Sequence, residues 1–239
     1  MKITLLIPTL NEIVGMKAIM PNVRRDWVDQ IMILDGGSTD GTVEWAREQG
    51  YDVYVQKERG LREGYIEVMP LCVGDVVITF SPDGNSLTEK IPELVAKMRE
   101  GYDMVIVSRY LEGAESLDDD ILTTFGNWFF TNVINLLFGG RYTDAMVLYR
   151  GYTKKILADL RILQGGHSRL WDKCIGRLVS IEPLLSVRAA KFHAKVAEIP
   201  GSEPVRIGGV RKMMPFRTGS AVLFQVVQEF LTSGPERVL

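Results

Sequence analysis

Short apolar runs alternate with longer helix-like stretches through the first 110 residues, and no other feature limits the possible folds as much. Several runs are apolar at nearly every position, which is typical of strands that are covered on both faces of a sheet. Strands that alternate with helices favour a parallel sheet. We therefore predict an α/β fold with an open, mostly parallel sheet and helices on both faces. The expected strands cover residues 3–7, 30–34, 52–56, 76–80 and 104–107, and the expected helices cover 14–24, 42–49, 61–71 and 89–100.

The rhythm changes after about residue 110, where an acidic segment at residues 112–120 interrupts the alternation. An apolar, aromatic-rich helix is expected at Ile121–Phe138, and an amphipathic helix at residues 220–231 closes the chain. No repeat or low-complexity tract divides the sequence, so we predict a single domain over residues 1–239, with halves at 1–110 and 111–239. Between the two late helices we expect strands at 146–150 and 194–199, helices at 152–160 and 170–179, and a loop rich in glycine, proline and basic residues at 201–215.

Composition excludes several classes of function. The formal net charge is −2, whereas bulk binding to nucleic acid requires a basic surface, so no nucleic-acid partner is expected. The two cysteines, Cys72 and Cys174, form no CxxC pattern and no cluster with histidine. Neither a disulfide framework nor a zinc site is indicated, and we expect a cytoplasmic location. The first residues lack a signal-peptide cleavage pattern and are expected to form a buried strand.

Polar side chains follow three of the expected strands at the point where each strand ends, at residues 8–12, 35–42 and 81–85. In an open α/β sheet, ligands bind in the crevice beside these ends. The segment 35–42 is also a glycine-rich turn in which Ser38 or a neighbour caps the next helix, and a cap needs no ligand. A cap does not require Asp35, however, and its carboxylate is placed to accept hydrogen bonds from a base or ribose. Since GxGxxG is absent, we expect a nucleotide pocket of another kind than a dinucleotide fold.

Five motifs resemble those of family 2 glycosyltransferases and occur in the same order. The resemblance covers nearly the whole chain and is most specific in the first 110 residues. It implies a GT-A fold, a GDP- or UDP-sugar donor and inversion at the anomeric carbon, with residues 1–110 binding the nucleotide sugar and residues 111–239 facing the acceptor. The later EIP and GGVRK segments, with Arg206, resemble the polyprenyl-phosphate branch that includes dolichyl-phosphate mannose synthases. The motifs are IPTLNE at 7–12, LDGGSTDGT at 34–42, ERGLREGY at 58–65, GDVVITFSPDGN at 74–85 and VSRY at 107–110.

The resemblance also assigns roles to single residues. Asp83 matches the second acid of an Asp-x-Asp motif, and Asn85 falls where the branch often has another metal ligand. Arg109 matches an arginine that meets the phosphate of the acceptor or donor, and Asp144 matches an acid of the branch, whose following Ser-Gly-Phe-Arg is replaced here by residues 147–150. The expected catalytic residues are Asp83, Arg109 and Asp144, and the expected metal ligands are Asp83 and Asn85. The expected donor-binding residues are Pro8, Leu10, Asn11, Glu12, Asp35, Asp40, Arg59, Gly60, Ser81, Arg206, Arg211 and Lys212.

Ser81 departs from the motif, because it stands where the family has the first acid. Mg²⁺ and Mn²⁺ favour oxygen ligands and usually bind through one or two carboxylates together with phosphates and water. The loss of one carboxylate predicts weak binding of the cation in the absence of substrate, so the metal is expected to arrive with the nucleotide. The alternative is that residues 81–85 form only a turn, since Pro, Asp, Gly and Asn are favoured turn residues.

Basic residues in the loop 201–215 lie among glycines. Guanidinium groups can bind two phosphate oxygens at once, so we interpret Arg206, Arg211 and Lys212 as a lid over the diphosphate. The alternative is a solvated, charged loop.

The helix at Ile121–Phe138 is too apolar for an ordinary solvated helix. Its apolar part extends to about 16 residues or roughly 24 Å, short of a hydrocarbon core of about 30 Å. One interpretation is burial against the sheet or in a homodimer interface. The other is that this helix and the one at 220–231 rest on the inner face of a membrane, as a peripheral contact, and present a lipid-phosphate acceptor.

Three questions of function stay open at the level of sequence. A lipid phosphate is already ionised at neutral pH, whereas a sugar hydroxyl requires a base. A nucleotidyltransferase of similar layout is a further alternative, but residues 6–17 lack its glycine-rich, basic signature. Ser81 also leaves open a catalytically inactive relative.

Overall fold

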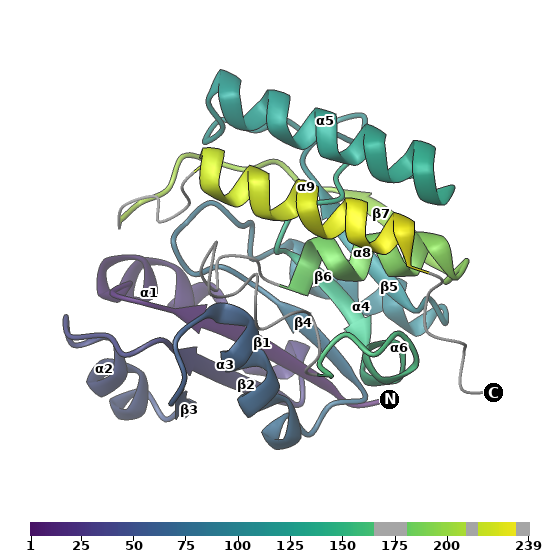
Figure 1. Cartoon of the computed structure of the whole chain (residues 1–239). Helices are drawn as coiled ribbons and strands as arrows, with labels where there is room; N and C mark the ends of the chain where they lie inside the picture. Colours follow the sequence, from purple (N-terminus) through teal and green to yellow (C-terminus); the bar gives the residue numbers. More distant parts are fainter. Residues whose placement is uncertain (165–180, 209–214, 233–239) are drawn as a thin grey trace.

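The computed structural model describes residues 1–164, 181–208 and 215–232. These residues form a sheet of seven strands in the order β3-β2-β1-β4-β6-β5-β7 (Figure 1). Neighbouring strands run parallel except at β6, which is antiparallel to both β4 and β5. The strands are β1 Ile3–Thr9, β2 Gln30–Asp35, β3 Asp52–Val55, β4 Val76–Thr79, β5 Met104–Ser108, β6 Arg150–Thr153 and β7 Val196–Pro200.

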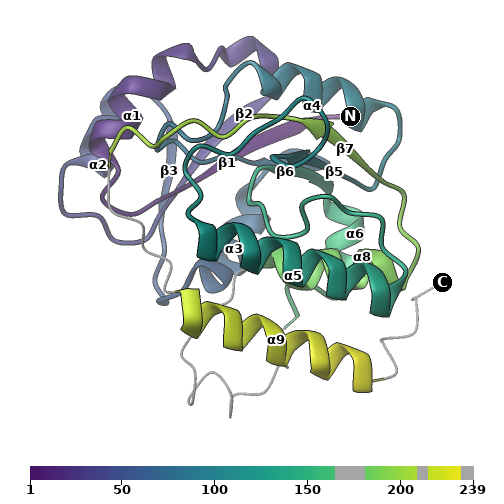
Figure 2. The same ribbon diagram turned by 90° about the horizontal axis from the view of Figure 1, so that it is seen from above.

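Helices cover both faces of the sheet, as Figure 2 shows. Successive side chains of β1 point to opposite faces, so that Leu5 belongs to one buried cluster and Leu6 to the other. Both faces are therefore dry, which explains why β1 is apolar at nearly every position. The predicted α/β class is confirmed. One face carries α1 Ile13–Ile19, α2 Thr42–Glu48 and α4 Lys90–Arg99, and the other carries α3 Leu61–Val68, α5 Ile121–Phe138, α6 Lys154–Asp159, α8 Ile181–Lys191 and α9 Pro215–Leu231.

The segment around β6 differs from the prediction. A strand was expected at 146–150 and a helix at 152–160, but β6 begins only at Arg150 and α6 begins at Lys154. Arg150 is fully buried, and its guanidinium donates to the Ala145 carbonyl at 3.1 Å and to the Ser186 hydroxyl at 2.9 Å. A charged residue rarely enters a dry strand without such partners. The partner on α8 could not be read from the local pattern, so the strand was placed too early.

Other boundaries have simple physical causes. The helix α8 was not predicted, because all its residues except Lys191 are buried and no polar face marks it as a helix. The helices expected at 14–24 and 61–71 end earlier, where Pro21 and Pro70 lie in single 3₁₀ turns. The helix expected at 170–179 lies outside the described residues.

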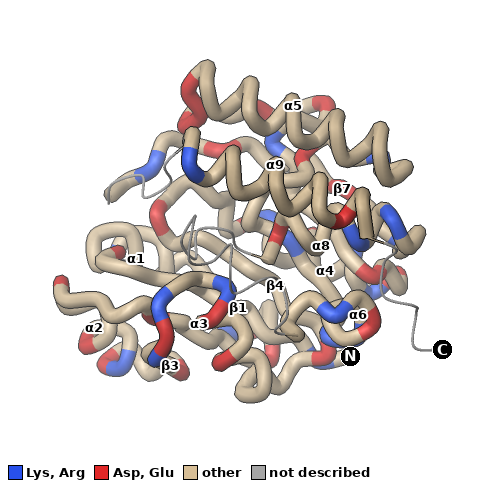
Figure 3. The backbone as a smooth tube through the Cα atoms, viewed as in Figure 1, with Lys and Arg blue, Asp and Glu red and all other residues tan. Residues whose placement is uncertain are grey.

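The helices α5 and α9 lie side by side as the outer layer of their face (Figures 1 and 2). Figure 3 shows how few charges they carry: α5 has none, and α9 has only Arg217 and Glu229. The sequence predicted an apolar segment too short to span a membrane, but α5 is longer than that segment. By length and composition alone, it is the one helix of the described chain that would suffice to cross a membrane, with 18 residues and a mean hydropathy of 1.2. Only 22% of it is buried.

The apolar residues of these helices are divided between the core and the surface. Ile134, Phe138, Val222 and Val226 belong to the core. Seven other apolar side chains are more than half exposed, and we call them the apolar surface. They are Ile121, Phe125, Trp128 and Leu136 on α5, and Phe216, Phe230 and Leu231 on α9.

Candidate functional site

A hollow of about 660 Å³ opens at the carboxyl ends of β1, β2 and β4. Parallel strands bring these ends to one edge of the sheet, where the sequence predicted a ligand crevice. Half of the predicted donor-binding residues line this hollow, namely Pro8, Leu10, Glu12, Arg59, Gly60 and Ser81. Residues without a predicted role complete the lining: Thr9, Leu34, Gly36, Gly37, Gln56, Leu61 and Leu148.

Asp35 holds the loop that forms one wall of the hollow. It is fully buried, and its Oδ1 accepts hydrogen bonds from the backbone N–H groups of Gly37 at 2.8 Å and Ser38 at 2.7 Å. Its Oδ2 accepts from the hydroxyls of Ser38 at 2.6 Å and Thr9 at 2.9 Å. These four bonds use the acceptor positions of a carboxylate, and they fix the loop whose glycines line the hollow. Direct contact of Asp35 with a base or ribose stays a prediction.

Asn11 and Asp40 join the same wall to α1. Asn11 adopts a left-handed conformation with φ of 54°, and its Oδ1 accepts from the N–H of Thr39 at 2.8 Å. Asp40 accepts from the N–H of Ile13 at 3.1 Å and from the hydroxyl of Thr42 at 2.6 Å. Burial opposes ionisation of Asp40, but these bonds outweigh it and lower the pKa of its carboxyl group. Both residues therefore support the wall.

The turn that follows β4 carries Asp83, whose side chain is nearly buried. The N–H of Asn85 donates to Asp83 Oδ1 at 3.2 Å, and the N–H of Ile207 donates to the Asp83 carbonyl at 2.7 Å. The turn also contacts α1 closely, because a Cβ at Gly15 would lie 2.4 Å from the Pro82 carbonyl oxygen. The segment after β7 and the start of α1 thus enclose Asp83.

The residues at this turn fit a hard divalent cation that binds together with a diphosphate. The Asp83 carboxylate, the Asn85 amide oxygen and the Ser81 hydroxyl are all oxygen donors, which Mg²⁺ and Mn²⁺ prefer. In the described part of the chain, no group of three or more His, Cys, Asp or Glu side chains is placed to hold a metal ion. Phosphate oxygens and water would have to supply the remaining ligands.

Arg109, which follows β5, is the centre of an ion-pair cluster. Its guanidinium binds Asp144 in a bidentate pair, with Nε to Oδ2 at 2.7 Å and Nη2 to Oδ1 at 3.1 Å. Its Nη1 lies 3.1 Å from both Asp119 Oδ2 and Glu203 Oε2. Burial opposes the charge of Arg109, but the three carboxylates outweigh it and hold the pKa of the guanidinium well above its ordinary value. Two of the three predicted catalytic residues therefore form one bonded unit.

Arg206 connects this region to the turn that carries Asp83. Its Nη1 lies 3.3 Å from Asp83 Oδ2, and its Nη2 lies 2.9 Å from Asp118 Oδ2. Five carboxylates thus surround the guanidinium groups of Arg109 and Arg206. The excess of negative charge attracts cations to this edge of the sheet. The predicted residues Arg211 and Lys212 lie outside the described residues.

Four acids of the site had no predicted role: Asp118, Asp119, Glu198 and Glu203. The first two belong to the acidic segment 112–120, which the sequence indicated only as a loop. The run of acidic residues was the only feature of the sequence that could have indicated them. Its partners, Arg109 and Arg206, lie far away in the sequence and are brought against it by the fold.

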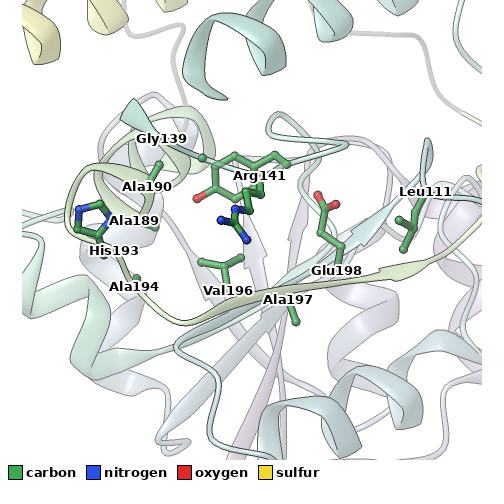
Figure 4. Close-up of a pocket in the computed structure, with 12 residues that line it drawn as sticks. Leu111, Gly139, Arg141, Ala189, Ala190, His193, Ala194, Val196, Ala197 and Glu198 are labelled. Atoms are coloured by element: carbon green, nitrogen blue, oxygen red, sulfur yellow. The ribbon is translucent and has the colours of Figure 1, made fainter. Parts of the chain in front are cut away.

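Glu198 supports the site from the side of β7. It faces a separate hollow of about 520 Å³ beside β7, into which the Arg141 side chain points (Figure 4). The Glu198 carboxylate accepts from the N–H of Thr143 at 2.9 Å and from the N–H of Asp144 at 3.1 Å. These bonds fix the backbone that carries Asp144, and through it the position of Arg109.

Together, the sheet order, the strand-end hollow and the acidic turn define a glycosyltransferase with the GT-A fold. Residues 4–161 match the model of the glycosyl transferase family 2, and the chain belongs to that family. Among solved structures, the glucosyl-3-phosphoglycerate synthase of Mycobacterium tuberculosis in complex with Mn²⁺, UDP and phosphoglyceric acid has a similar fold. The TM-score is 0.65 with 17% identity, over 98% of this chain and 80% of that one.

Two relatives are similar over most of this sequence. The dolichyl-phosphate hexose transferase of Haloferax volcanii is 27% identical over 222 residues, which cover 92% of this chain and 90% of that protein. The dolichol-phosphate mannosyltransferase of Pyrococcus furiosus is 32% identical over 226 residues, which cover 89% of this chain and 59% of that protein.

Proposed function

We propose that this chain transfers a sugar from a nucleoside-diphosphate sugar to a polyprenyl phosphate, with inversion at the anomeric carbon. One observation carries the proposal: Ser81 lines the strand-end hollow, and Asp83, two residues further on, is ion-paired beside the Arg109 cluster. A donor in the hollow would therefore have its diphosphate beside the acids. The names of the two relatives, which act on dolichyl or dolichol phosphate, support the lipid acceptor.

The donor nucleoside would occupy the hollow between the Pro8–Leu10 segment and the glycine loop held by Asp35. Arg59 and Gly60 also line this hollow. The structural neighbour holds UDP, which supports a UDP-sugar as the donor. The lining residues named above are equally compatible with a GDP-sugar. On this assignment residues 1–110 bind the donor and residues 111–239 face the acceptor.

A divalent cation held by Asp83 and Asn85 would supply positive charge to the departing diphosphate. The structure of the mycobacterial glucosyl-3-phosphoglycerate synthase, which has a similar fold and contains Mn²⁺, supports this role. Because Ser81 offers no charge, the protein contributes one carboxylate from the motif. The cation affinity should then depend strongly on bound nucleotide.

In the reaction, an oxygen of the acceptor phosphate attacks the anomeric carbon, and the bond from that carbon to the β-phosphate oxygen breaks. The attacking oxygen is already ionised at neutral pH, so no side chain has to remove a proton. The protein acts by holding both substrates in line and by stabilising the leaving diphosphate. Arg206 is placed for the second task, since its guanidinium can exchange the Asp83 carboxylate for a phosphate oxygen while it keeps Asp118 as a partner.

The acceptor lipid would reach the site along α5 and α9, at the cytoplasmic face of a membrane. The apolar surface provides the contact, and a cavity of about 140 Å³ lies between the two helices. Phe125, Phe130, Met146 and Val222 are among its lining residues. Met146 connects this cavity to the Arg109 cluster, because its N–H donates to Asp144 Oδ1 at 3.4 Å. An isoprenoid chain that enters this cavity would hold its phosphate toward Arg109.

A sugar hydroxyl is a second candidate acceptor, and the charge of the Arg109 cluster favours it. Three carboxylates surround the single positive charge of Arg109, so the cluster has an excess of negative charge and disfavours a phosphate. One of these carboxylates would then accept the hydroxyl proton.

A panel of GDP- and UDP-sugars identifies the donor and tests the class of reaction. We expect one donor to be consumed, with release of the nucleoside diphosphate. Release of pyrophosphate from a nucleoside triphosphate would identify a nucleotidyltransferase instead. A folded protein that binds nucleotide and consumes no sugar donor, with any acceptor supplied, would be a non-catalytic relative.

A further inference from the structure

Glu203 bonds to both the predicted cation-binding turn and the Arg109 cluster. Its side chain is nearly buried, and its Oε1 accepts a hydrogen bond from Asn85 Nδ2 at 3.1 Å. Its Oε2 accepts from Arg109 Nη1 at 3.1 Å and from the Ser116 hydroxyl at 2.5 Å. Nothing in the sequence marked Glu203, which lies after the EIP segment in a loop expected to bind through its basic residues.

The backbone around Glu203 holds this carboxylate in place. The N–H of Glu203 donates to the Glu115 carbonyl at 2.8 Å, and the N–H of Leu117 donates to the Glu203 carbonyl at 2.8 Å. Ser116 and Glu203 form an isolated parallel bridge. The acidic loop and the loop after β7 are therefore joined at this residue. The carboxylate has little freedom to leave Asn85 and Arg109.

The bond to Glu203 decides which end of the Asn85 amide faces the cation. A carboxylate accepts hydrogen bonds and donates none, so the amide nitrogen of Asn85 must face Glu203. The amide oxygen then points away from Glu203, where it accepts a hydrogen bond from the Ser86 hydroxyl at 3.3 Å and keeps a second acceptor position for a cation. An Asn85 side chain without this constraint can rotate and present its nitrogen, which does not bind a hard cation.

We propose that Glu203 is a positioning residue that couples the cation site to Arg109, by orienting the Asn85 amide with one oxygen and holding the arginine with the other. The inference rests on the proposed function, because it takes Asn85 as a ligand of the cation. It adds a residue to that site and a specific path between its two parts. Loss of the Glu203 charge should therefore weaken cation binding, although Glu203 is not itself a ligand.

The test is the affinity of the protein for Mn²⁺, measured by calorimetry with the protein saturated with UDP and, separately, with GDP. We expect Glu203→Gln to weaken Mn²⁺ binding about tenfold, the effect of one lost hydrogen bond to a charged group. Glu112→Gln is the matched control, since Glu112 is an exposed acid of the neighbouring acidic segment 112–120. Its affinity for Mn²⁺ should equal that of the wild type.

A double-mutant cycle separates positioning from a general loss of structure. If Glu203 acts through Asn85, then Glu203→Gln added to Asn85→Ala should cause no further loss of Mn²⁺ affinity. Independent, additive losses would overturn the inference, and so would a Glu203→Gln affinity equal to that of the wild type. If Glu203→Gln does not fold, Glu203→Asp gives the same comparison, because it keeps the charge but withdraws it from Asn85.

Failure of the underlying proposal would look different. If the wild-type protein binds no Mn²⁺ with either nucleotide, the cation site itself is wrong, and the coupling falls with it. If the wild type binds Mn²⁺ and the cycle is additive, only the role of Glu203 is wrong.

Discussion

The guanidinium of Arg206 lies 3.3 Å from the Oδ2 of Asp83, the one acid left in the altered Asp-x-Asp motif. A cation of the protein therefore occupies the side of Asp83 where a metal or diphosphate is expected. Arg206 also pairs with Asp118, so it still has a carboxylate partner if Asp83 binds a metal ion instead. The arrangement suits a residue that exchanges a carboxylate for phosphate when the donor binds.

Arg206→Ala should have opposite effects on two ligands. Nucleotide-sugar affinity should fall about tenfold, because a charged hydrogen bond to phosphate is lost. Affinity for Mn²⁺ without nucleotide should rise, because Asp83 is no longer neutralised. Calorimetry measures both, with Arg47→Ala as the control, since Arg47 is exposed on α2. If donor affinity does not change, Arg206 serves only to hold Asp83.

Ser81→Asp should tighten Mn²⁺ binding in the absence of nucleotide by restoring a second anionic oxygen. Ser81 lines the donor hollow and is half-buried, so a larger side chain has room to reach solvent or cation. Titration with Mn²⁺ alone is the measurement, and Ser81→Asn is the uncharged control. Equal affinity in Ser81→Asp and wild type would mean that position 81 does not face the cation.

Asp35→Ala should weaken nucleotide binding more than it slows turnover at saturating donor. The carboxylate holds the loop of Gly37 and Ser38, so its loss releases the wall of the hollow. Loss of hydrogen bonds to a charged group costs about 1.5 to 3 kcal/mol, or roughly tenfold or more in affinity. Nucleotide titration tests this, and thermal unfolding shows whether the loop alone or the whole fold is affected. A dissociation constant within error of the wild type would remove Asp35 from the donor site.

The apolar surface should bind anionic vesicles. Phe125 and Trp128 are 57% and 60% exposed, so Phe125→Ser with Trp128→Ser should leave the fold intact and reduce flotation with vesicles of phosphatidylglycerol. A double variant at the C-terminal end of α4, Lys97→Ser with Glu100→Ser, controls for general effects. Wild-type protein that stays unbound and sediments as a dimer would instead identify α5 and α9 as a homodimer interface.

The parts of the fold that were predictable depend on neighbours in sequence. β1 and β2 were located because dry faces require continuous apolar runs. α5 was located to the residue from its apolar run, and in the structure Asp120 caps its start and Gly139 follows its end. β6 and α8 were not, because Arg150 and Ser186 satisfy each other across the core. In a sequence, a charged residue such as Arg150 is expected at the surface unless its buried partner is known.

The same distinction applies to the site. The polar strand ends predicted the donor hollow because parallel strands must end together. The role of Glu203 was not predictable, because it depends on the loop after β7 meeting both Asn85 and Arg109. Asp118 and Asp119 were visible only as an acidic run, whose arginine partners lie elsewhere in the sequence.

The most direct test of the account is transfer of labelled sugar from the donor that the panel identifies. Vesicles would contain polyprenyl phosphate, or polyprenyl alcohol as the control without the phosphate. We predict that wild-type protein moves label into the lipid fraction only with the phosphate, and that folded Asp83→Ala, which removes the carboxylate aimed at metal and diphosphate, moves none. Label transferred equally to both lipids or only to soluble hydroxyls, or equal turnover by Asp83→Ala, would contradict the account.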